Sequence, residues 1–210
     1  MRNANRIYRV TPGPAIVVLA LAIVAGPTNA QKADRPTVRV GDWWQFVEYY
    51  GIASTEPNRH WVITSVTSSR IEGTENGELL ALTPELNVLE SPRNKSSNPQ
   101  SLNFPLETGK KWHFATKWVF KVTGSKGIAN ADVEVVAYEK VTVPAGAFDA
   151  FKLASKWSLR GDSVKGSRVE GDVDSTYWYA PAARAVVKSI THNPYIGVST
   201  VELIKFHPQP

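Results

Sequence analysis

The sequence contains no cysteine, and its one methionine is the initiator, so almost no sulfur is present. The absence of cysteine excludes disulfide bonds, a thiol nucleophile and metal bound by thiolates. It also leaves nothing for the ordinary oxidation of thiols and internal thioethers. Stability must come from packing, and the aromatic side chains, among them seven tryptophans, are the large groups available for a core.

Signatures of catalytic and cofactor sites are missing as well. The chain has no Gly-x-Ser-x-Gly elbow, phosphate-binding loop, dinucleotide fingerprint or His-Glu-x-x-His motif. Its four histidines, His60, His113, His192 and His207, are isolated from one another along the chain. We therefore predict no enzyme, no catalytic residue, no metal site and no cofactor.

One acidic cluster leaves alternatives open. Glu170, Asp172 and Asp174 place three carboxylates within five residues, which could hold calcium, although the distal glutamate of a calcium loop is missing. Asp172 and Asp174 could also serve a hydrolase of envelope glycans, because such enzymes use paired carboxylates. An exposed acidic hairpin end is the simpler interpretation, and the hydrolase is kept as a remote alternative.

Helical periodicity is scarce, and alternation with a period of two is common. In residues 112–122, Trp112, Phe114 and Trp118 fall on one face and lysines on the other, which indicates a half-buried strand. Short helical turns are expected at residues 85–90 and 182–185, and residues 91–101 form the longest expected loop. Further strands are expected at residues 38–50, 60–67, 70–74, 78–82, 133–143, 151–159, 175–179, 184–191 and 197–206.

Turn signals separate these strands. Asn76-Gly77 predicts a hairpin between residues 70–74 and 78–82, and Pro144-Ala145-Gly146 predicts a tight turn after residue 143. Asp42 is expected to cap the bend into the first long strand. We predict an all-β fold, an antiparallel meander of about 9–10 strands forming a curved sheet, half-barrel or barrel, with minimal helix.

Residues 1–30 have the order of a secretory signal peptide. Three arginines precede an apolar run of residues 15–25, and small residues lead to Ala30, where cleavage is expected. The run is too short to span a membrane, so we expect no stable membrane span after cleavage. Residues 31–210 then form one β domain that is periplasmic or secreted. Without those arginines the net charge falls from +5 to about +2, which gives no reason to expect nucleic-acid binding.

The charged and aromatic strand faces have different interpretations. Lysines on the outward faces, such as Lys111 and Lys156, are expected to be solvated and to pair across strands with Asp132 and Glu134. Core packing is the simpler explanation for the tryptophans that fall on inward faces, but they could also line a concave sheet and bind a ligand. The candidate ligand-binding residues are Trp44, Trp112, Trp118, Trp157 and Trp178.

Several motifs together suggest a family. They are Gly41-Asp42-Trp43-Trp44, Phe104-Pro105-Leu106, Val143-Pro144-Ala145-Gly146-Ala147-Phe148-Asp149-Ala150 and Tyr177-Trp178-Tyr179-Ala180-Pro181. The chain resembles a group of uncharacterised exported β-domain proteins of Gram-negative bacteria. That group is distantly similar to the half-barrels of periplasmic lipoprotein carriers, which hold acyl chains under a helical lid. The resemblance implies a concave sheet and brings no catalytic residues, and this sequence has almost no helix for such a lid.

The sequence thus favours a noncatalytic periplasmic binding or accessory protein. The expected partner is a hydrophobic or amphipathic small molecule, such as a lipid-like one, held in an aromatic-lined concave sheet. The alternative is a module of the cell envelope that binds an envelope protein and has no small-molecule ligand.

Overall fold

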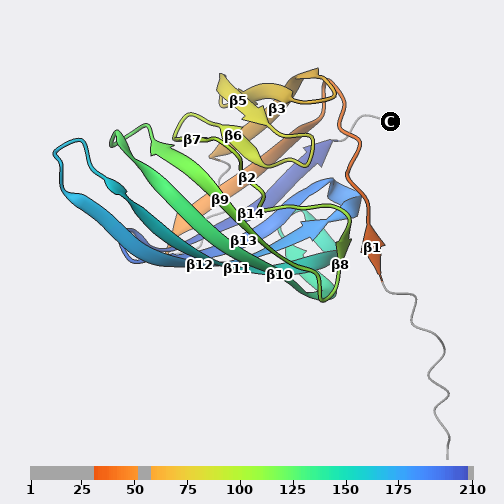
Figure 1. The fold of residues 1–210 in the computed structure, drawn as a ribbon. Coiled ribbons are helices and arrows are strands. Elements are labelled where there is room, and N and C mark those ends of the chain that lie inside the picture. The colour runs from red at the N-terminus through yellow and green to blue at the C-terminus, as the bar shows by residue number, and fades with distance from the viewer. Residues whose placement is uncertain (1–30, 52–57, 208–210) are drawn as a thin grey trace, which may run out of the picture.

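The computed structural model describes residues 31–51 and 58–207 (Figure 1). The predicted signal peptide, residues 1–30, lies outside the described residues. In the described part the protein is built almost wholly of antiparallel strands, and one 3-10 turn, Pro181–Ala183, interrupts them. No helix in this part is long and apolar enough to cross a membrane.

Twelve strands of the described chain form one closed barrel, and two short ones pair outside it. The outer pair is β1 (Lys32–Ala33) with β8 (Leu106–Glu107). The barrel strands are β2 (Trp43–Tyr50), β3 (Arg59–Val66), β4 (Ile71–Glu75), β5 (Glu78–Leu82), β6 (Val88–Glu90), β7 (Asn94–Ser96), β9 (Lys111–Phe120), β10 (Ser125–Val143), β11 (Gly146–Asp162), β12 (Arg168–Ala180), β13 (Ala185–Asn193) and β14 (Gly197–His207).

The strands follow one another around the barrel as a meander. Each pairs with the next in sequence from β9 to β14, β14 pairs with β2, and the order continues from β2 to β7. The last seam is between β7 and β9, where Asn94 lies opposite Phe120 and Ser96 opposite Trp118. The predicted all-β antiparallel class is confirmed. Of the three predicted arrangements, a curved sheet, a half-barrel or a barrel, the structure has the barrel.

Two local predictions in the segment between β5 and β9 are wrong. Residues 85–90 were expected to make a helical turn, but Val88–Glu90 forms β6 beside β5. The expected loop at residues 91–101 contains β7. Both strands have three residues, and neither carries an alternating pattern. Their pairing with neighbours decides their conformation, so the barrel has more strands than the sequence predicts.

The predicted turns and caps are confirmed. Asn76 and Gly77 both have positive φ, at 54° and 86°, as a two-residue hairpin turn between β4 and β5 requires. The turn after β10 leads into β11 at Gly146, and the Ala145 amide there donates to the Leu203 carbonyl of β14 at 3.0 Å. Asp42 is fully buried and accepts a hydrogen bond from the Arg39 amide at 2.9 Å.

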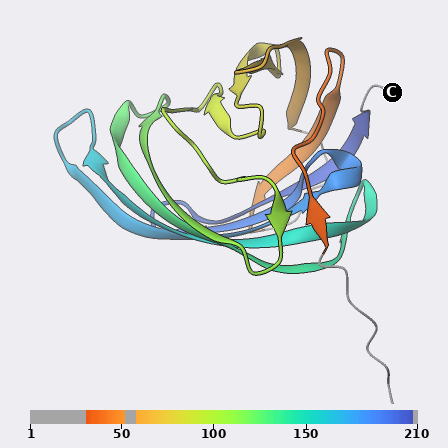
Figure 2. The same ribbon diagram turned by 45° about the vertical axis from the view of Figure 1, so that its right-hand side comes forward.

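One end of the barrel is filled by side chains. Leu102 and Leu106, from the segment that precedes β9, pack inward against Phe114, Phe151 and Leu153. Figure 2 shows that segment and β8 lying along the barrel beside β1. The opposite end, where the turns after β9, β11 and β13 lie, has only a small cluster of Trp118, Ala129, Leu159 and Val173. The interior is therefore packed at one end and sparsely filled at the other.

The outer face carries cross-strand charge pairs, as predicted. Lys111 lies 3.1 Å from Glu134, and His113 lies 2.9 Å from Asp132. Three of these four side chains are more than half exposed and Glu134 is 40% exposed, so each pair contributes little stability, at most about 1 kcal/mol.

The barrel cavity as candidate functional site

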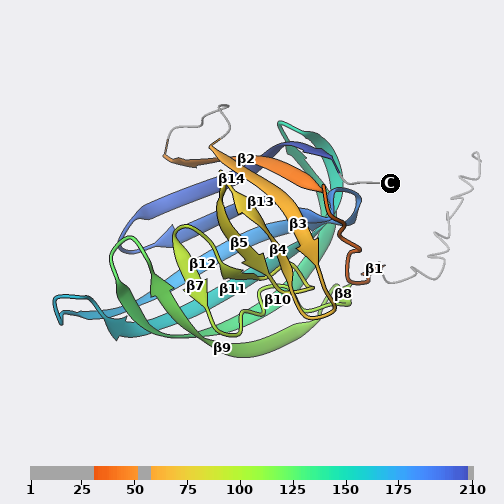
Figure 3. The ribbon, with the colours of Figure 1, turned by 90° about the horizontal axis from the view of Figure 1, so that it is seen from above.

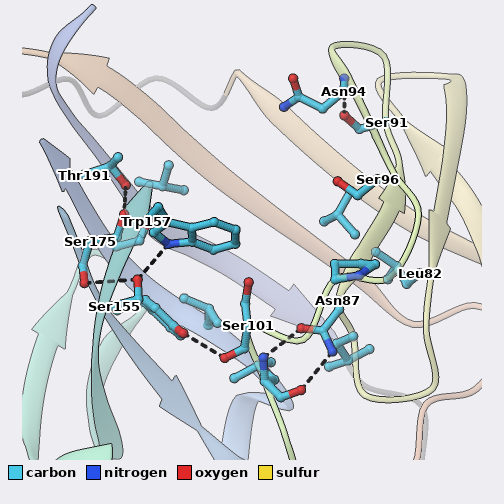
Figure 4. Close-up of a pocket in the computed structure, with 18 of the residues that line it drawn as sticks. Leu82, Asn87, Ser91, Asn94, Ser96, Ser101, Ser155, Trp157, Ser175 and Thr191 are labelled. Carbon is cyan, nitrogen blue, oxygen red and sulfur yellow. Dashed lines mark hydrogen bonds between the residues drawn. The ribbon is translucent and has the colours of Figure 1, made fainter. Parts of the chain in front are cut away.

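A cavity of about 520 Å³ lies inside the barrel (Figure 4). Its lining comes from β2, β3 and the segment around β6 and β7 on one side, and from β9 to β14 on the other. A volume of this size is within the range of about 300–1,000 Å³ that small-molecule sites occupy. The arrangement can enclose a ligand between the long strands and the β5–β7 segment.

Aromatic and aliphatic side chains form most of the wall. Trp44, Trp118 and Trp157 line the cavity, together with Trp61 and Phe120. Trp157 meets Phe114 edge to face, and Trp61 meets Phe46 in the same way, with ring centroids 5.2 and 5.4 Å apart. Rings held by such contacts present a rigid apolar surface to whatever occupies the cavity.

A line of hydroxyl groups runs across the β11–β13 side of the wall, as Figure 4 shows. Ser175 and Thr191 lie 3.0 Å apart, and the Ser155 hydroxyl accepts a hydrogen bond from the Trp157 indole at 2.9 Å. The Tyr177 hydroxyl donates to the Ser101 carbonyl at 2.7 Å. Burial raises the pKa of Tyr177 above its ordinary value, so this phenol stays protonated and remains a donor.

Polar contacts join two parts of the segment between β5 and β9 to each other, and one contact ties this segment to the wall. The Asn87 side chain donates to the Leu102 carbonyl at 2.8 Å and accepts from the Leu102 amide at 2.7 Å (Figure 4). With the bond from Tyr177 to Ser101, these contacts fix the segment over the interior.

The two cations of the lining lie beside buried carboxylates. Arg59 lies 3.0 Å from Glu75, and Arg184 lies 3.7 Å from Asp42. Glu75 and Asp42 are 3% and 0% exposed. Because each positive charge has a nearby negative one, the lining offers little net attraction to an anion. The wall suits an uncharged or weakly polar group.

Three of the five predicted ligand-binding tryptophans line the cavity, and two do not. Trp112 faces inward but lies at the packed end, where its indole donates to the Gln100 carbonyl at 2.7 Å. Trp178 lies on the other face of β12, where its indole donates to Glu139 at 2.8 Å and the Lys152 ammonium lies over its ring. Of these five, the cavity therefore brings together Trp44, Trp118 and Trp157.

Several lining residues were not among the predicted ones. Tyr177 shares the inward face of β12 with Ser175, but Tyr177-Trp178-Tyr179 has no alternation from which that face could be predicted. Trp61 lies in an expected strand, but nothing there indicates which face is inward. Asn87 and Ser101 lie in a segment without periodicity, and no sequence signal places them.

Trp118 is the one indole of the lining whose nitrogen lacks an acceptor in the described residues. The side chain is 5% exposed and packs against Phe120, with ring centroids 4.6 Å apart and the ring planes tilted by 35°. Buried donors nearly always have a partner, so this nitrogen is unusual.

The other candidate residues lie away from the cavity. Asp172 and Asp174 are exposed and alternate with the cavity-lining Val173 and Ser175, so they face outward. Among the described residues no group of three or more His, Asp or Glu side chains is arranged to hold a metal ion. His60 and His207 both contact the Trp43 ring, with centroids 5.8 and 6.1 Å away.

Comparisons with known proteins define the fold only. No protein-family model matches the sequence, and no curated protein matches it. A candidate lipoprotein from Parabacteroides distasonis superposes with a TM-score of 0.50 at 16% identity, covering 83% of this chain and 99% of that one. This protein thus shares its fold with an independently solved structure.

Two further solved structures are similar at lower scores. A candidate exported protein with a YmcC-like fold from Bacteroides fragilis has a TM-score of 0.48 at 16% identity, over 83% of this chain and 99% of that one. The hypothetical lipoprotein YmcC from Escherichia coli K12 has a TM-score of 0.46 at 12% identity, over 80% and 85%.

Proposed function

We propose that this protein is an exported, noncatalytic binding protein that holds a hydrophobic or amphipathic small molecule inside its barrel. The observation that carries the proposal is the cavity of about 520 Å³ walled by tryptophans in an otherwise packed fold. Export is supported by the signal-like residues 1–30 and by the name of the Parabacteroides structure, a candidate lipoprotein.

The wall indicates the general chemistry of the ligand. Its tryptophans would cover the apolar part of the ligand, and the hydroxyls of Ser175, Thr191 and Ser189 would face a few oxygen atoms of the ligand. The charges of Arg59 and Arg184 lie beside carboxylates, so the enclosed part of the ligand is expected to be neutral. A charged head group, if the ligand has one, would remain outside the cavity.

Mass spectrometry of the protein purified from the cell without refolding tests the proposal directly. A small molecule that is present under native conditions and released on denaturation is the expected result. An environment-sensitive apolar dye should also bind with increased fluorescence and be displaced by the released molecule. A protein with neither a bound molecule nor dye binding would contradict the proposal. It would leave the alternative, a module for an envelope protein.

A variant that fills the cavity makes the dye measurement specific. Ser189 lines the cavity from β13. The phenyl ring introduced by Ser189→Phe would occupy the space of the ligand, so dye binding should be lost. Ser158 faces outward on β11, between Asn130 and Asp172 of the neighbouring strands. Ser158→Phe adds the same ring outside the barrel and should leave dye binding unchanged.

A further inference from the structure

The two most exposed large apolar side chains of the described residues lie on hairpin tips of the barrel. Val122, in the turn between β9 and β10, is 79% exposed, and Val164, in the turn between β11 and β12, is 73% exposed. Ile196, between β13 and β14, is 57% exposed. Because consecutive antiparallel strands alternate in direction, these three turns are at the same end of the barrel (Figures 1 and 3). We call this set of turns the rim.

Neighbouring tips of the rim touch each other. A Cβ on Gly124 would lie 2.4 Å from a methyl carbon of Val164, so the β9–β10 and β11–β12 turns are in contact. On the next turn, the Tyr195 ring lies over Gly171 of β12, and its hydroxyl accepts from the Glu170 amide at 2.9 Å. The exposed side chains therefore stand on one connected edge.

The rim is also basic. Residues 121–126 and 162–168 together contain one carboxylate, Asp162, and four cationic side chains: Lys121, Lys126, Lys165 and Arg168. Two of the cations are paired, Lys121 with Glu90 at 2.8 Å and Arg168 with Glu170 at 3.0 Å. Lys126 and Lys165 make no ion pair with any described residue.

The rim borders the cavity. Lining residues include Phe120, the last residue of β9, and Asn193, the last residue of β13. The cavity therefore extends to the end of the barrel at which the exposed apolar and basic side chains stand.

We propose that the rim is a docking surface for an anionic lipid membrane. Exposed apolar side chains at the tips of adjoining turns can enter the headgroup region together, and the unpaired lysines beside them favour an anionic surface. Attraction between these lysines and anionic lipid would strengthen the binding. Docking in this way would place the cavity against the bilayer. The proposal goes beyond the binding function above and does not depend on it.

Sedimentation with lipid vesicles tests the rim. Vesicles containing phosphatidylglycerol should bind the protein, vesicles of phosphatidylcholine alone should bind it at least about tenfold more weakly, and added salt should weaken binding to the anionic ones. The combined variant Val122→Ser, Val164→Ser, Ile196→Ser and the charge variant Lys126→Glu, Lys165→Glu should each lower the partition coefficient at least about tenfold.

Matched controls lie elsewhere on the barrel. Val40, Val66 and Val136 are exposed but not on the rim, so replacing all three by serine should leave vesicle binding unchanged. Lys117→Glu with Lys156→Glu makes the same change in net charge away from the rim. No binding to anionic vesicles, or equal loss in rim and control variants, would overturn the proposal.

The cavity and the rim can be tested separately. Ser189→Phe should abolish binding of the apolar dye and leave vesicle binding unchanged. The rim variants should still bind the dye and should bind anionic vesicles much more weakly. A protein that binds anionic vesicles through the rim but never binds the dye would contradict the proposed function and leave the rim proposal standing.

Discussion

The indoles that line the cavity differ in the partner of their nitrogen. Trp44 donates to the Ala183 carbonyl at 2.8 Å, and Trp157 donates to Ser155 at 2.9 Å. Trp118 has no acceptor in the described part of the chain. A buried donor without an acceptor costs about 1–3 kcal/mol. The same replacement should therefore have different effects at two positions of one wall.

Trp118→Phe and Trp157→Phe test this difference. Both remove an indole nitrogen and a similar apolar area, but only the second leaves Ser155 without its donor. Trp157→Phe should lower the free energy of unfolding by about 1 kcal/mol more than Trp118→Phe, measured by urea denaturation. An equal or larger loss for Trp118→Phe would show that its nitrogen has a partner in solution.

At the residue scale, alternation predicted the inward position of Trp118 and Trp157 and failed at Trp178. The first two lie in strands whose apolar and polar residues alternate cleanly. Tyr177-Trp178-Tyr179 has no such alternation, so a period of two cannot assign its faces. The outer face of β12 is itself buried there, because Trp178 packs in a cluster with Val141, Phe148 and Ala150 of the β10–β11 hairpin.

At the element scale, the seam that closes the barrel could not be predicted. The segment Asn94–Ser96 is polar and three residues long, and it becomes β7 because β9 lies beside it. Glu90 of β6 joins the elements on both sides of this seam. It lies 3.5 Å from Lys95 of β7 and 2.8 Å from Lys121, just after β9.

Acid should weaken this seam through Glu90. Its hydrogen bond with the Lys121 ammonium lowers the pKa of Glu90 below the ordinary value. The folded protein therefore holds this proton less tightly than the unfolded chain does. The stabilisation is complete above about pH 4.3, the unfolded value, and disappears as pH falls through the lowered folded value.

Glu90→Gln should remove that part of the acid sensitivity. Thermal melts of the variant should lose less stability than the wild type between neutral pH and the acid range, while the variant is less stable at neutral pH. Glu134→Gln, on the exposed outer face, is the control and should leave the pH profile nearly unchanged. Identical profiles for Glu90→Gln and wild type would contradict the role of Glu90.

The outer part of the β10–β11 hairpin contains a close crossing of two glycines. Gly127 and Gly161 lie opposite each other, and a Cβ on Gly127 would lie 2.0 Å from the Arg160 carbonyl oxygen. A Cβ on Gly161 would lie 2.2 Å from the Lys126 carbonyl oxygen. The strands can approach this closely only without side chains.

Gly127→Ala should separate these strands locally. The expected loss is about 1–3 kcal/mol of unfolding free energy, with faster amide exchange near residues 126–128 and 160–162. Gly171→Ala is the matched control, because its Cβ would lie 3.1 Å from a side-chain carbon of Pro194 that can move. Equal stability of the two variants would show that the strands at Gly127 and Gly161 have room for a methyl group.

At the scale of the whole molecule, the class of fold followed from the sequence and the cavity did not. Alternating strands and tight turns predict an antiparallel barrel or half-barrel. Whether its interior is hollow depends on how many side chains enter it. Leu102 and Leu106 fill one end from a segment without periodicity, and small residues such as Ala129 leave space near the other.

Native-state hydrogen exchange should reveal this difference between the two ends. Amides of β10 around residues 133–135, beside the packed cluster, should exchange slowly, and those around residues 126–129 should exchange faster. A ligand in the cavity should slow the second set more than the first. Uniform protection along β10 without ligand would contradict a loosely filled end.

Lys32 in β1 and His207 at the end of β14 both lie at the barrel end opposite the rim (Figure 1). Attachment of the protein to a sensor chip or a bead at either position would therefore leave the rim, and the cavity that it borders, facing away from the support. On a surface coated with the protein through either position, every molecule would have the same orientation, with its cavity toward the solution.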